Sequence, residues 1–278
     1  MTTLHEVLAD LRNTGGAGAS LRKHLTAVGI NKWEDFSTEA LYDLRDHLKE
    51  SVAPSTAKTI AANLKAILNR YGKAVDLPAG WEKALSVKSD DARGTFLTDA
   101  ELLAFENVET LSDTERIVQV ESLIEAYTGA RISDAAAFTE DNFTADGQLT
   151  YTSKKTHTTA TIPVSEKTKG WILYAQEHRA DEPTLMSRNR IIRRLARRAG
   201  ITERVKVRKG GRDVIAPKCD LLSSHAFRRS TATNLVLKGV TMEQAMVALG
   251  HRDMAMTRRY CVATRVNFSD KALAYFGV

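Results

Sequence analysis

The sequence predicts a mainly helical protein of two domains with one small antiparallel β-sheet. Apolar residues recur at helical spacing through most of the chain, whereas strand-like alternation is concentrated in residues 147–165. The stretch DLPAGWEKALSVKSDDARG interrupts the helical pattern with proline, glycine and charge, so we place a linker near residues 86–95. The 278 residues, 43% of them apolar, suffice for two cores. We therefore expect domains over residues 1–88 and 96–278.

The first domain is expected to contain only short helices. The segments with helical patterns are residues 4–13, 20–29, 37–50 and 55–72. Ser20 and Ser37 are candidate N-caps, because a serine hydroxyl can accept a hydrogen bond from a free backbone N–H of the first turn. Gly29 and Gly72 are candidate helix stops. This domain is therefore predicted to be a small helical unit.

The second domain is expected to begin with a capped helix at Thr98, with Glu101 three residues later. Gly129 should divide residues 115–138 into two helices, and β-branched residues around a polar centre predict a hairpin over residues 147–165. The pattern then returns to helices, except for a basic loop or ribbon with a Gly-Gly turn. The helical pattern resumes at residues 167–179, and the loop or ribbon is expected over residues 205–220. Two further helical segments follow, residues 223–239 with Ser224 as N-cap and residues 241–251 with Thr241 as N-cap.

Several classes of protein are disfavoured by composition. The chain has two cysteines, Cys219 and Cys261, far apart in the sequence, which indicates a reducing compartment and no disulfide scaffold. Neither cysteine belongs to a zinc-binding pattern. The N-terminal residues do not resemble a secretory signal, and no run of about 18 apolar residues suggests a membrane span. We expect a cytoplasmic protein that needs no metal or cofactor.

Positive charge is concentrated in the second half of the chain. The net charge is +6, and residues 187–229 hold fourteen lysines and arginines against three acids, whereas the first 96 residues are nearly balanced. Such a segment favours a polyanionic partner, because lysine and arginine release counterions from phosphates. The alternative is an ordinary solvated helix face.

Two arginines follow patterns that suit phosphate binding. In HAFRR, His225 and Arg228 share a helix face near its N-terminus, where an anion is favoured. In YTGARISD, Arg131 follows the turn at Gly129, and Asp134 lies one turn on, where it could hold the guanidinium. The alternatives are a surface histidine with a paired arginine, and an ordinary capped helix.

The remaining candidates lie in the hairpin and near the end of the chain. Lys154 and Lys155 could reach a bound backbone and donate a proton, or could simply keep the hairpin soluble. In GHRDMAMTRRY, a continuous helix would place His251 and Tyr260 on opposite faces. Gly250 breaks that helix, so the two side chains can converge. The alternatives are a histidine at a helix C-terminus and a partly buried tyrosine.

Residues 96–265 resemble the tyrosine recombinase (phage integrase) family. The resemblance is carried by five features in order: TGAR, a hairpin lysine, HAFRR, LGH, and a tyrosine nine residues after the histidine of LGH. The first unit is similar to that family's small core-binding (SAM-like) domain. The resemblance implies that Arg131 and Arg228 clamp the non-bridging oxygens of the scissile phosphate. It also implies that His225 and His251 hydrogen-bond this phosphate and assist proton transfer.

The resemblance gives Tyr260 the role of nucleophile and Lys155 the role of general acid for the leaving 5′ oxygen. Lys155 is preferred to Lys154 because it directly precedes Thr156, as in the family's KT pattern. Asp134 matches a supporting acid. Phosphate contacts to DNA are expected from the basic segment, at Arg193, Arg194, Arg197, Arg198, Lys206, Arg208, Lys209 and Arg229.

The implied function is site-specific DNA recombination through a 3′-phosphotyrosyl intermediate, without metal or ATP. The implied partners are double-stranded DNA, a homotetramer joined through the C-terminal segment 267–278, and possible accessory DNA-bending proteins; bound to DNA, the protein would associate with the nucleoid. Because the first unit is short, with no separate arm-binding domain in view, binding to accessory sites is not expected. Two alternatives stay open: strand nicking and resealing of the type IB topoisomerase kind, and a DNA-binding homologue that has lost catalysis.

Overall fold

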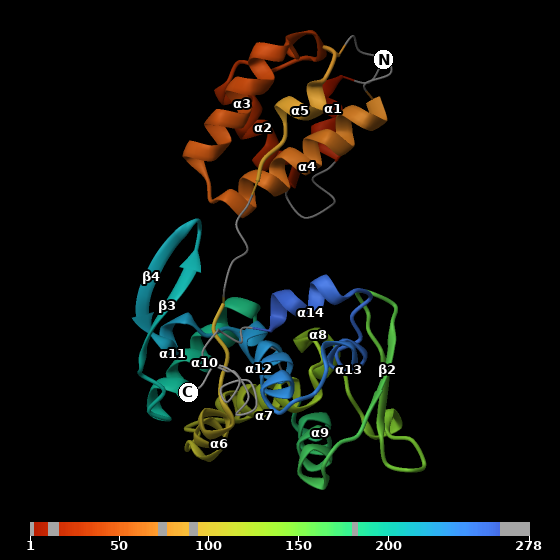
Figure 1. Cartoon of the computed structure of the whole chain (residues 1–278), viewed down its shortest axis with the longest axis vertical. Coiled ribbons are helices and arrows are strands. Elements are labelled where there is room, and N and C mark those ends of the chain that lie inside the picture. Colours follow the sequence, from red (N-terminus) through yellow and green to blue (C-terminus); the bar gives the residue numbers. More distant parts are fainter. Residues whose placement is uncertain (1–2, 11–16, 72–76, 89–93, 180–182, 262–278) are drawn as a thin grey trace, which may run out of the picture. The chain divides into compact units, whose positions relative to one another are not determined.

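The computed structural model describes residues 3–10, 17–71, 77–88, 94–179 and 183–261, which form two compact units (Figure 1). The first unit comprises Met1–Ala92 with the short segment Arg208–Arg212, and the second comprises Arg93–Val207 with Asp213–Val278. Helices dominate both units, as the sequence predicts. None of the described helices has the length and apolar character needed to span a membrane.

The first unit is a small helical bundle. Its elements are α1 (Leu4–Asp10), α2 (Ala17–Ala27), the 3₁₀ helix η2 (Trp33–Asp35), α3 (Thr38–Ser51), α4 (Pro54–Tyr71) and α5 (Trp81–Ala84). The predicted cap at Ser37 is confirmed, because its hydroxyl accepts a hydrogen bond from the Ala40 amide at 3.1 Å. The predicted cap at Ser20 is wrong. The helix begins at Ala17, because the alanines before Ser20 favour the helical conformation as well.

The second unit contains the remaining helices and two two-stranded sheets. Its elements are α6 (Asp99–Asn107), α7 (Asp113–Thr128), α8 (Ile132–Ala135), the 3₁₀ helix η4 (Glu140–Asn142), β1 (Leu149–Thr152), β2 (Thr159–Ile162), α9 (Glu166–His178), α10 (Leu185–Arg198), β3 (Arg204–Lys209), β4 (Arg212–Pro217), α11 (Lys218–Leu221), α12 (Ser224–Leu237), α13 (Met242–Ala248) and α14 (Met254–Tyr260).

Helix α7 runs through the centre of the second unit. It contacts α6, α9, α10 and α12 (Figure 1). Most of its side chains are buried. Val118, Leu123 and Ile124 are fully buried in the core that these helices share. The helix ends at Gly129, whose φ of +68° is in the left-handed region that favours glycine. The predicted break at Gly129 is therefore confirmed, and it delivers Arg131 to the start of α8.

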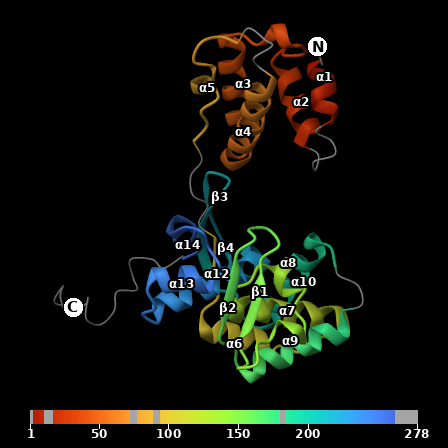
Figure 2. The same ribbon diagram turned by 90° about the vertical axis from the view of Figure 1, so that its right-hand side faces the viewer.

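The predicted hairpin is formed by β1 and β2 (Figure 2). Leu149 pairs with Ile162, and Thr152 pairs with Thr159, so apolar side chains alternate toward the core. The strands are joined by the turn of residues 153–158, which holds both candidate lysines.

Residues 204–217, in the middle of the basic segment, form a second sheet, the ribbon β3–β4, so the structure has two small sheets where one was predicted. Gly210 and Gly211 have φ values of +60° and +78°, which suit a two-residue hairpin turn with the twist of the flanking strands. The Gly-Gly turn therefore selects a ribbon over a loop.

Helix caps in the second unit follow the sequence with one shift. Thr98 and Thr241 each form a reciprocal capping box, with Glu101 and Gln244, as their positions suggest. Helix α12, however, begins at Ser224, and its N-cap is Ser223. The backbone of Ser223 is extended, which makes it the last residue outside the helix, and its hydroxyl makes no capping hydrogen bond.

Candidate active site

Arg131 is held at the start of α8 by the neighbouring hairpin turn. Its Nη1 donates to Ser153 Oγ at 2.8 Å and lies 3.5 Å from Thr156 Oγ1. Asp134 accepts hydrogen bonds from Ser153 Oγ at 2.8 Å and from the Lys154 amide at 3.1 Å. Asp134 therefore supports the guanidinium through Ser153, and it also fixes the start of the turn. Ser153 was missed by the sequence interpretation, because a single serine before two lysines carries no pattern of its own.

Arg228 is completely buried on α12, and its guanidinium is oriented by backbone carbonyls. It donates to the carbonyl of Gly129 and, at 2.7 Å, to the carbonyl of Leu249. Its Nε has no hydrogen-bond partner. The centre of the guanidinium lies 5.4 Å from the centre of the Tyr260 ring. Burial, and then the charge of Arg131, lower the pKa of Arg228 below its usual range.

Gly129 lies two residues before Arg131, and its carbonyl accepts a hydrogen bond from Arg228. A side chain at this position is therefore expected to destabilise the protein. A Cβ at Gly129 would lie 2.6 Å from Leu249 Cδ2 and 3.2 Å from Thr231 Cγ2, whereas one at Gly239, with φ of +86°, would meet nothing within 4 Å. We expect Gly239→Ala to cost about 1 kcal/mol for its left-handed backbone. Gly129→Ala should cost about 2–4 kcal/mol, because overpacking adds to the same strain. Urea unfolding of the two variants tests this, and equal losses would contradict it.

His251 lies between α13 and α14, where it meets the tyrosine. The rings of His251 and Tyr260 have centroids 5.1 Å apart, which confirms the convergence predicted from the break at Gly250. Nδ1 lies 2.9 Å from the Thr257 hydroxyl, and the buried Nε2 has no hydrogen-bond partner. Burial lowers the pKa of His251 to about 4, with further lowering by Arg228 and Arg131, so the imidazole is neutral at pH 7.

The low pKa of His251 predicts a pH-dependent stability. An unfolded histidine has a pKa near 6.5, so between about pH 4 and pH 6.5 the unfolded chain binds more protons. The free energy of unfolding should therefore fall as the pH drops through this window, by up to about 3 kcal/mol from this group. His251→Gln does not titrate there. The difference in unfolding free energy between wild type and His251→Gln should change with pH, and parallel curves would contradict the assignment.

His225 lies in the first turn of α12 among several cations, with one side open to solvent. Partial desolvation of the ring is the largest cause that lowers its pKa, and the charges of Arg229, Arg228, Lys155 and Arg131 add to it. Lys155 is exposed in the hairpin turn, and its charge acts on this histidine. The charges of Arg131 and Arg228 therefore act on both histidines, Lys155 acts on His225, and Tyr260 interacts with Arg228.

Buried carboxyl groups on α7 adjoin this cluster and were missed by the sequence interpretation. Glu121 pairs with Arg188 at 2.6 Å. Glu125 is fully buried, and both of its carboxyl oxygens lack a hydrogen-bond partner. Burial raises the pKa of Glu125 well above its usual range, although Arg228 and Arg188 partly oppose this. The sequence does show that Glu121 and Glu125 are four residues apart, and this spacing places both glutamates on one face of the helix.

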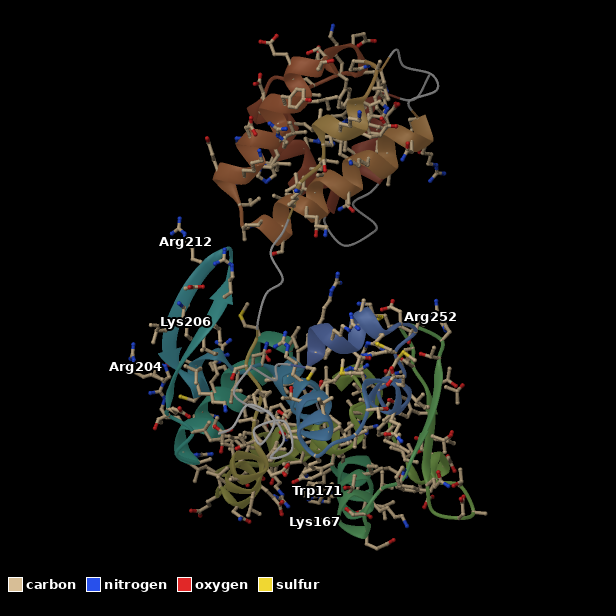
Figure 3. All side chains as sticks on the ribbon, in the orientation of Figure 1. Lys167, Trp171, Arg204, Lys206, Arg212 and Arg252 are labelled. Carbon is tan, nitrogen blue, oxygen red and sulfur yellow. The ribbon has the colours of Figure 1, made fainter. Side chains whose placement is uncertain are left out.

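Most of the residues predicted to contact DNA have partners within the protein. Arg194 and Arg198 pair with Glu115, Arg197 pairs with Asp220, Lys206 pairs with Asp213, and Arg193 donates to the Leu222 carbonyl. Arg194, Arg197 and Lys206 remain more than half exposed. The partners of Arg197 and Lys206 are exposed as well, so a DNA phosphate could replace these two weak surface pairs, whereas the Glu115 that holds Arg194 is buried. Figure 3 shows Lys206 on the ribbon with Arg204 and Arg212.

The other predicted contacts are less accessible or not described. Arg229 is half-buried and packs against the backbone at Gly94, where an added Cβ would lie 2.1 Å from its guanidinium. Arg208 is half-buried on β3. The side chain of Lys209 and the segment 267–278 lie outside the described part of the chain. Among the described residues, no group of three or more histidines, cysteines, aspartates or glutamates could hold a metal ion.

Comparisons with known proteins bear on the family and the fold. The model of the phage integrase family matches residues 101–266. Similar solved structures include a lambda integrase (75–356) dimer bound to a core site, with 17% identity, a TM-score of 0.68, and coverage of 97% of this chain and 98% of that chain. The Tn1549 transposon integrase bound to transposon right end DNA has 14% identity, a TM-score of 0.67 and full coverage of both chains.

A third similar structure is the XerH site-specific recombinase bound to a palindromic difH substrate, with 15% identity, a TM-score of 0.64, and coverage of 99% of this chain and 77% of that chain. No curated protein matches the chain in sequence. The structural likeness shows the tyrosine recombinase fold, and the family model covers well over half of the sequence. The chain therefore belongs to the phage integrase family.

Proposed function

We propose that the protein is a site-specific DNA recombinase that cuts and rejoins strands through a phosphotyrosyl link at Tyr260. One observation carries the proposal. The Tyr260 ring lies beside both the Arg228 guanidinium and the His251 ring, and the last two each hold a buried polar atom without a partner. Buried polar groups normally have hydrogen-bond partners, so the unpartnered Arg228 Nε and His251 Nε2 beside one tyrosine favour a polar ligand, and the charge of Arg228 favours an anionic one.

The ligand in this proposal is the scissile phosphate. Arg131 and Arg228 carry permanent positive charges. They stabilise the extra negative charge that develops on the non-bridging oxygens during attack. His251 is neutral, and its Thr257 contact leaves Nε2 to face the phosphate. His225 completes the set from the N-terminal turn of α12, where helix amides also favour an anion.

The chemical step is a balanced exchange of esters. Tyr260 Oη forms a bond to phosphorus as the bond between phosphorus and the 5′ oxygen breaks, so the phosphate remains a diester. The phenol loses its proton with the assistance of the histidines, and Lys155 gives a proton to the departing 5′ oxygen. The reverse reaction, with a 5′ hydroxyl from another strand, reseals DNA without ATP.

The stoichiometry of strand exchange favours a tetramer. Exchange between two duplexes cuts four strands, and each protomer offers one Tyr260, so four protomers act together on double-stranded DNA. The similar lambda integrase structure is a DNA-bound dimer, which fits half of such an assembly. In this proposal the first unit clamps the duplex as a core-binding domain, and residues 267–278 join neighbouring protomers.

The proposal is tested with a suicide duplex. A nick placed beside the scissile phosphate lets a short fragment diffuse away after cleavage, which traps the protein on the DNA as a band on a denaturing gel. The target would come from DNA that flanks the gene, or from DNA fragments recovered with the protein. A covalent adduct and exchanged products are expected. Relaxation of supercoils without exchange would favour a topoisomerase, and binding without an adduct would favour a non-catalytic protein.

A further inference from the structure

The hairpin turn of residues 153–158, which holds Lys155, is fixed from two sides. On one side Arg131 and Asp134 hold Ser153, as described above. On the other side, Thr158 Oγ1 donates to the Gly250 carbonyl at 3.1 Å, and Arg252 donates to the Thr156 carbonyl. Figure 3 shows Arg252 beside the end of the hairpin. The turn is therefore tied directly to the segment between α13 and α14.

The bond from Arg252 acts at the conformationally costly point of the turn. His157 has φ of +52°, and it is the one non-glycine residue with positive φ in the described part of the chain. A left-handed conformation is unfavourable for a residue with a Cβ and persists only when its surroundings hold it. The Thr156 carbonyl belongs to the peptide that precedes His157, so a donor on that oxygen restricts the rotation that would relieve the strain.

We propose that Arg252 is a positioning residue, which holds Lys155 where it can protonate the leaving 5′ oxygen. Thr156 directly follows Lys155, so fixing the Thr156 peptide fixes the backbone from which Lys155 extends. Arg252 directly follows His251, so the general acid is placed together with the segment that carries His251 and Tyr260. This inference rests on the proposed function, in which Lys155 is the general acid.

A change of the leaving-group atom distinguishes a role of Arg252 in proton donation from a role in DNA binding or folding. When sulfur replaces the bridging 5′ oxygen, the leaving group departs as a thiolate without a proton, because thiols have a pKa near 8.5. A defect confined to proton donation should disappear on that substrate. The experiment therefore measures single-turnover cleavage of matched oxygen- and sulfur-containing suicide duplexes by the full-length protein.

On the oxygen duplex, Lys155→Ala and Arg252→Ala are each expected to cleave more slowly, by roughly 100-fold or more for Lys155→Ala and roughly 10- to 100-fold for Arg252→Ala. On the sulfur duplex both should approach the wild-type rate. Arg252→Lys, which keeps a donor, should recover part of the loss on oxygen. Arg258→Ala is the matched control, because it removes an equal charge from an exposed position on the same segment, and sulfur should not improve it relative to wild type.

The outcomes distinguish the two levels of the proposal. If sulfur rescues Lys155→Ala but not Arg252→Ala, or if Arg252→Ala cleaves the oxygen duplex normally, the role of Arg252 is overturned and the general acid stands. If Lys155→Ala is not rescued, the assignment of the general acid fails, and the role of Arg252 fails with it. Absence of any wild-type adduct on either duplex would instead overturn the proposed function.

Discussion

Tyr260→Phe is expected to abolish the covalent DNA adduct while leaving the fold and DNA binding intact. The substitution removes one oxygen, which the proposed mechanism joins to phosphorus. The phenylalanine ring can keep the contact with the His251 ring, whose centroid lies 5.1 Å from that of Tyr260. It can also keep the contact with the Arg228 guanidinium, which lies over the Tyr260 ring. The proposed mechanism assigns no other side chain to the attack on phosphorus, so cleavage should fall below detection.

The matched control is Tyr127→Phe. Tyr127 belongs to the same unit, is partly exposed, and packs its ring against Trp171 with centroids 5.5 Å apart. Its hydroxyl has no role in the proposed chemistry, so this variant should form the adduct at the wild-type rate. A suicide duplex on a denaturing gel reports both variants, and a gel shift checks that each still binds. An adduct of normal yield from Tyr260→Phe would place the nucleophile elsewhere.

The parts of the fold that depend on local chemistry were predictable from sequence. Ser37, Thr98 and Thr241 mark helix starts because capping needs only a hydroxyl next to a helical pattern. Gly129 and Gly250 mark breaks because each has positive φ, which L side chains rarely adopt. The second break also predicted the meeting of His251 and Tyr260, since a helix of nine further residues would have separated them.

Features that depend on tertiary partners were not predictable in the same way. The basic segment indicated phosphate contacts, but Glu115, far earlier in the chain, pairs with both Arg194 and Arg198. The support that Asp134 gives to Arg131 passes through Ser153, which only the folded hairpin brings close. A sequence shows which side chains carry charge, whereas the fold decides which charges remain for a ligand.

Buried Glu125 is a further example of this limit. Helical spacing places it on the inner face of α7, but the pattern does not reveal that a carboxyl group lies there without a hydrogen-bond partner. Burial raises its pKa well above the usual range, which disfavours a negative charge beside Arg228. The neutral form of the acid would leave the positive charge of the two arginines available to a phosphate. The loss of its proton would oppose anion binding.

Arg228 should be the arginine whose replacement affects stability and activity together. Arg228→Ala leaves the carbonyls of Gly129 and Leu249 unpaired in the interior and opens a cavity, so the free energy of unfolding should fall by about 2–4 kcal/mol. Arg228→Lys keeps a charge but has no planar fork to reach both carbonyls and the phosphate. We expect it to lose less stability than Arg228→Ala, yet to cleave DNA roughly 100- to 1000-fold more slowly than wild type.

The lysine variant distinguishes the two roles, because folding and cleavage are measured on the same sample. Urea unfolding gives the stability, and adduct formation at a temperature where the variant remains folded gives the activity per folded molecule. A cleavage rate equal to wild type would show that the buried guanidinium serves the fold alone. A large loss in a folded protein would instead mean that the carbonyls of Gly129 and Leu249 orient this fork for a ligand, because a charge without that geometry cannot replace it.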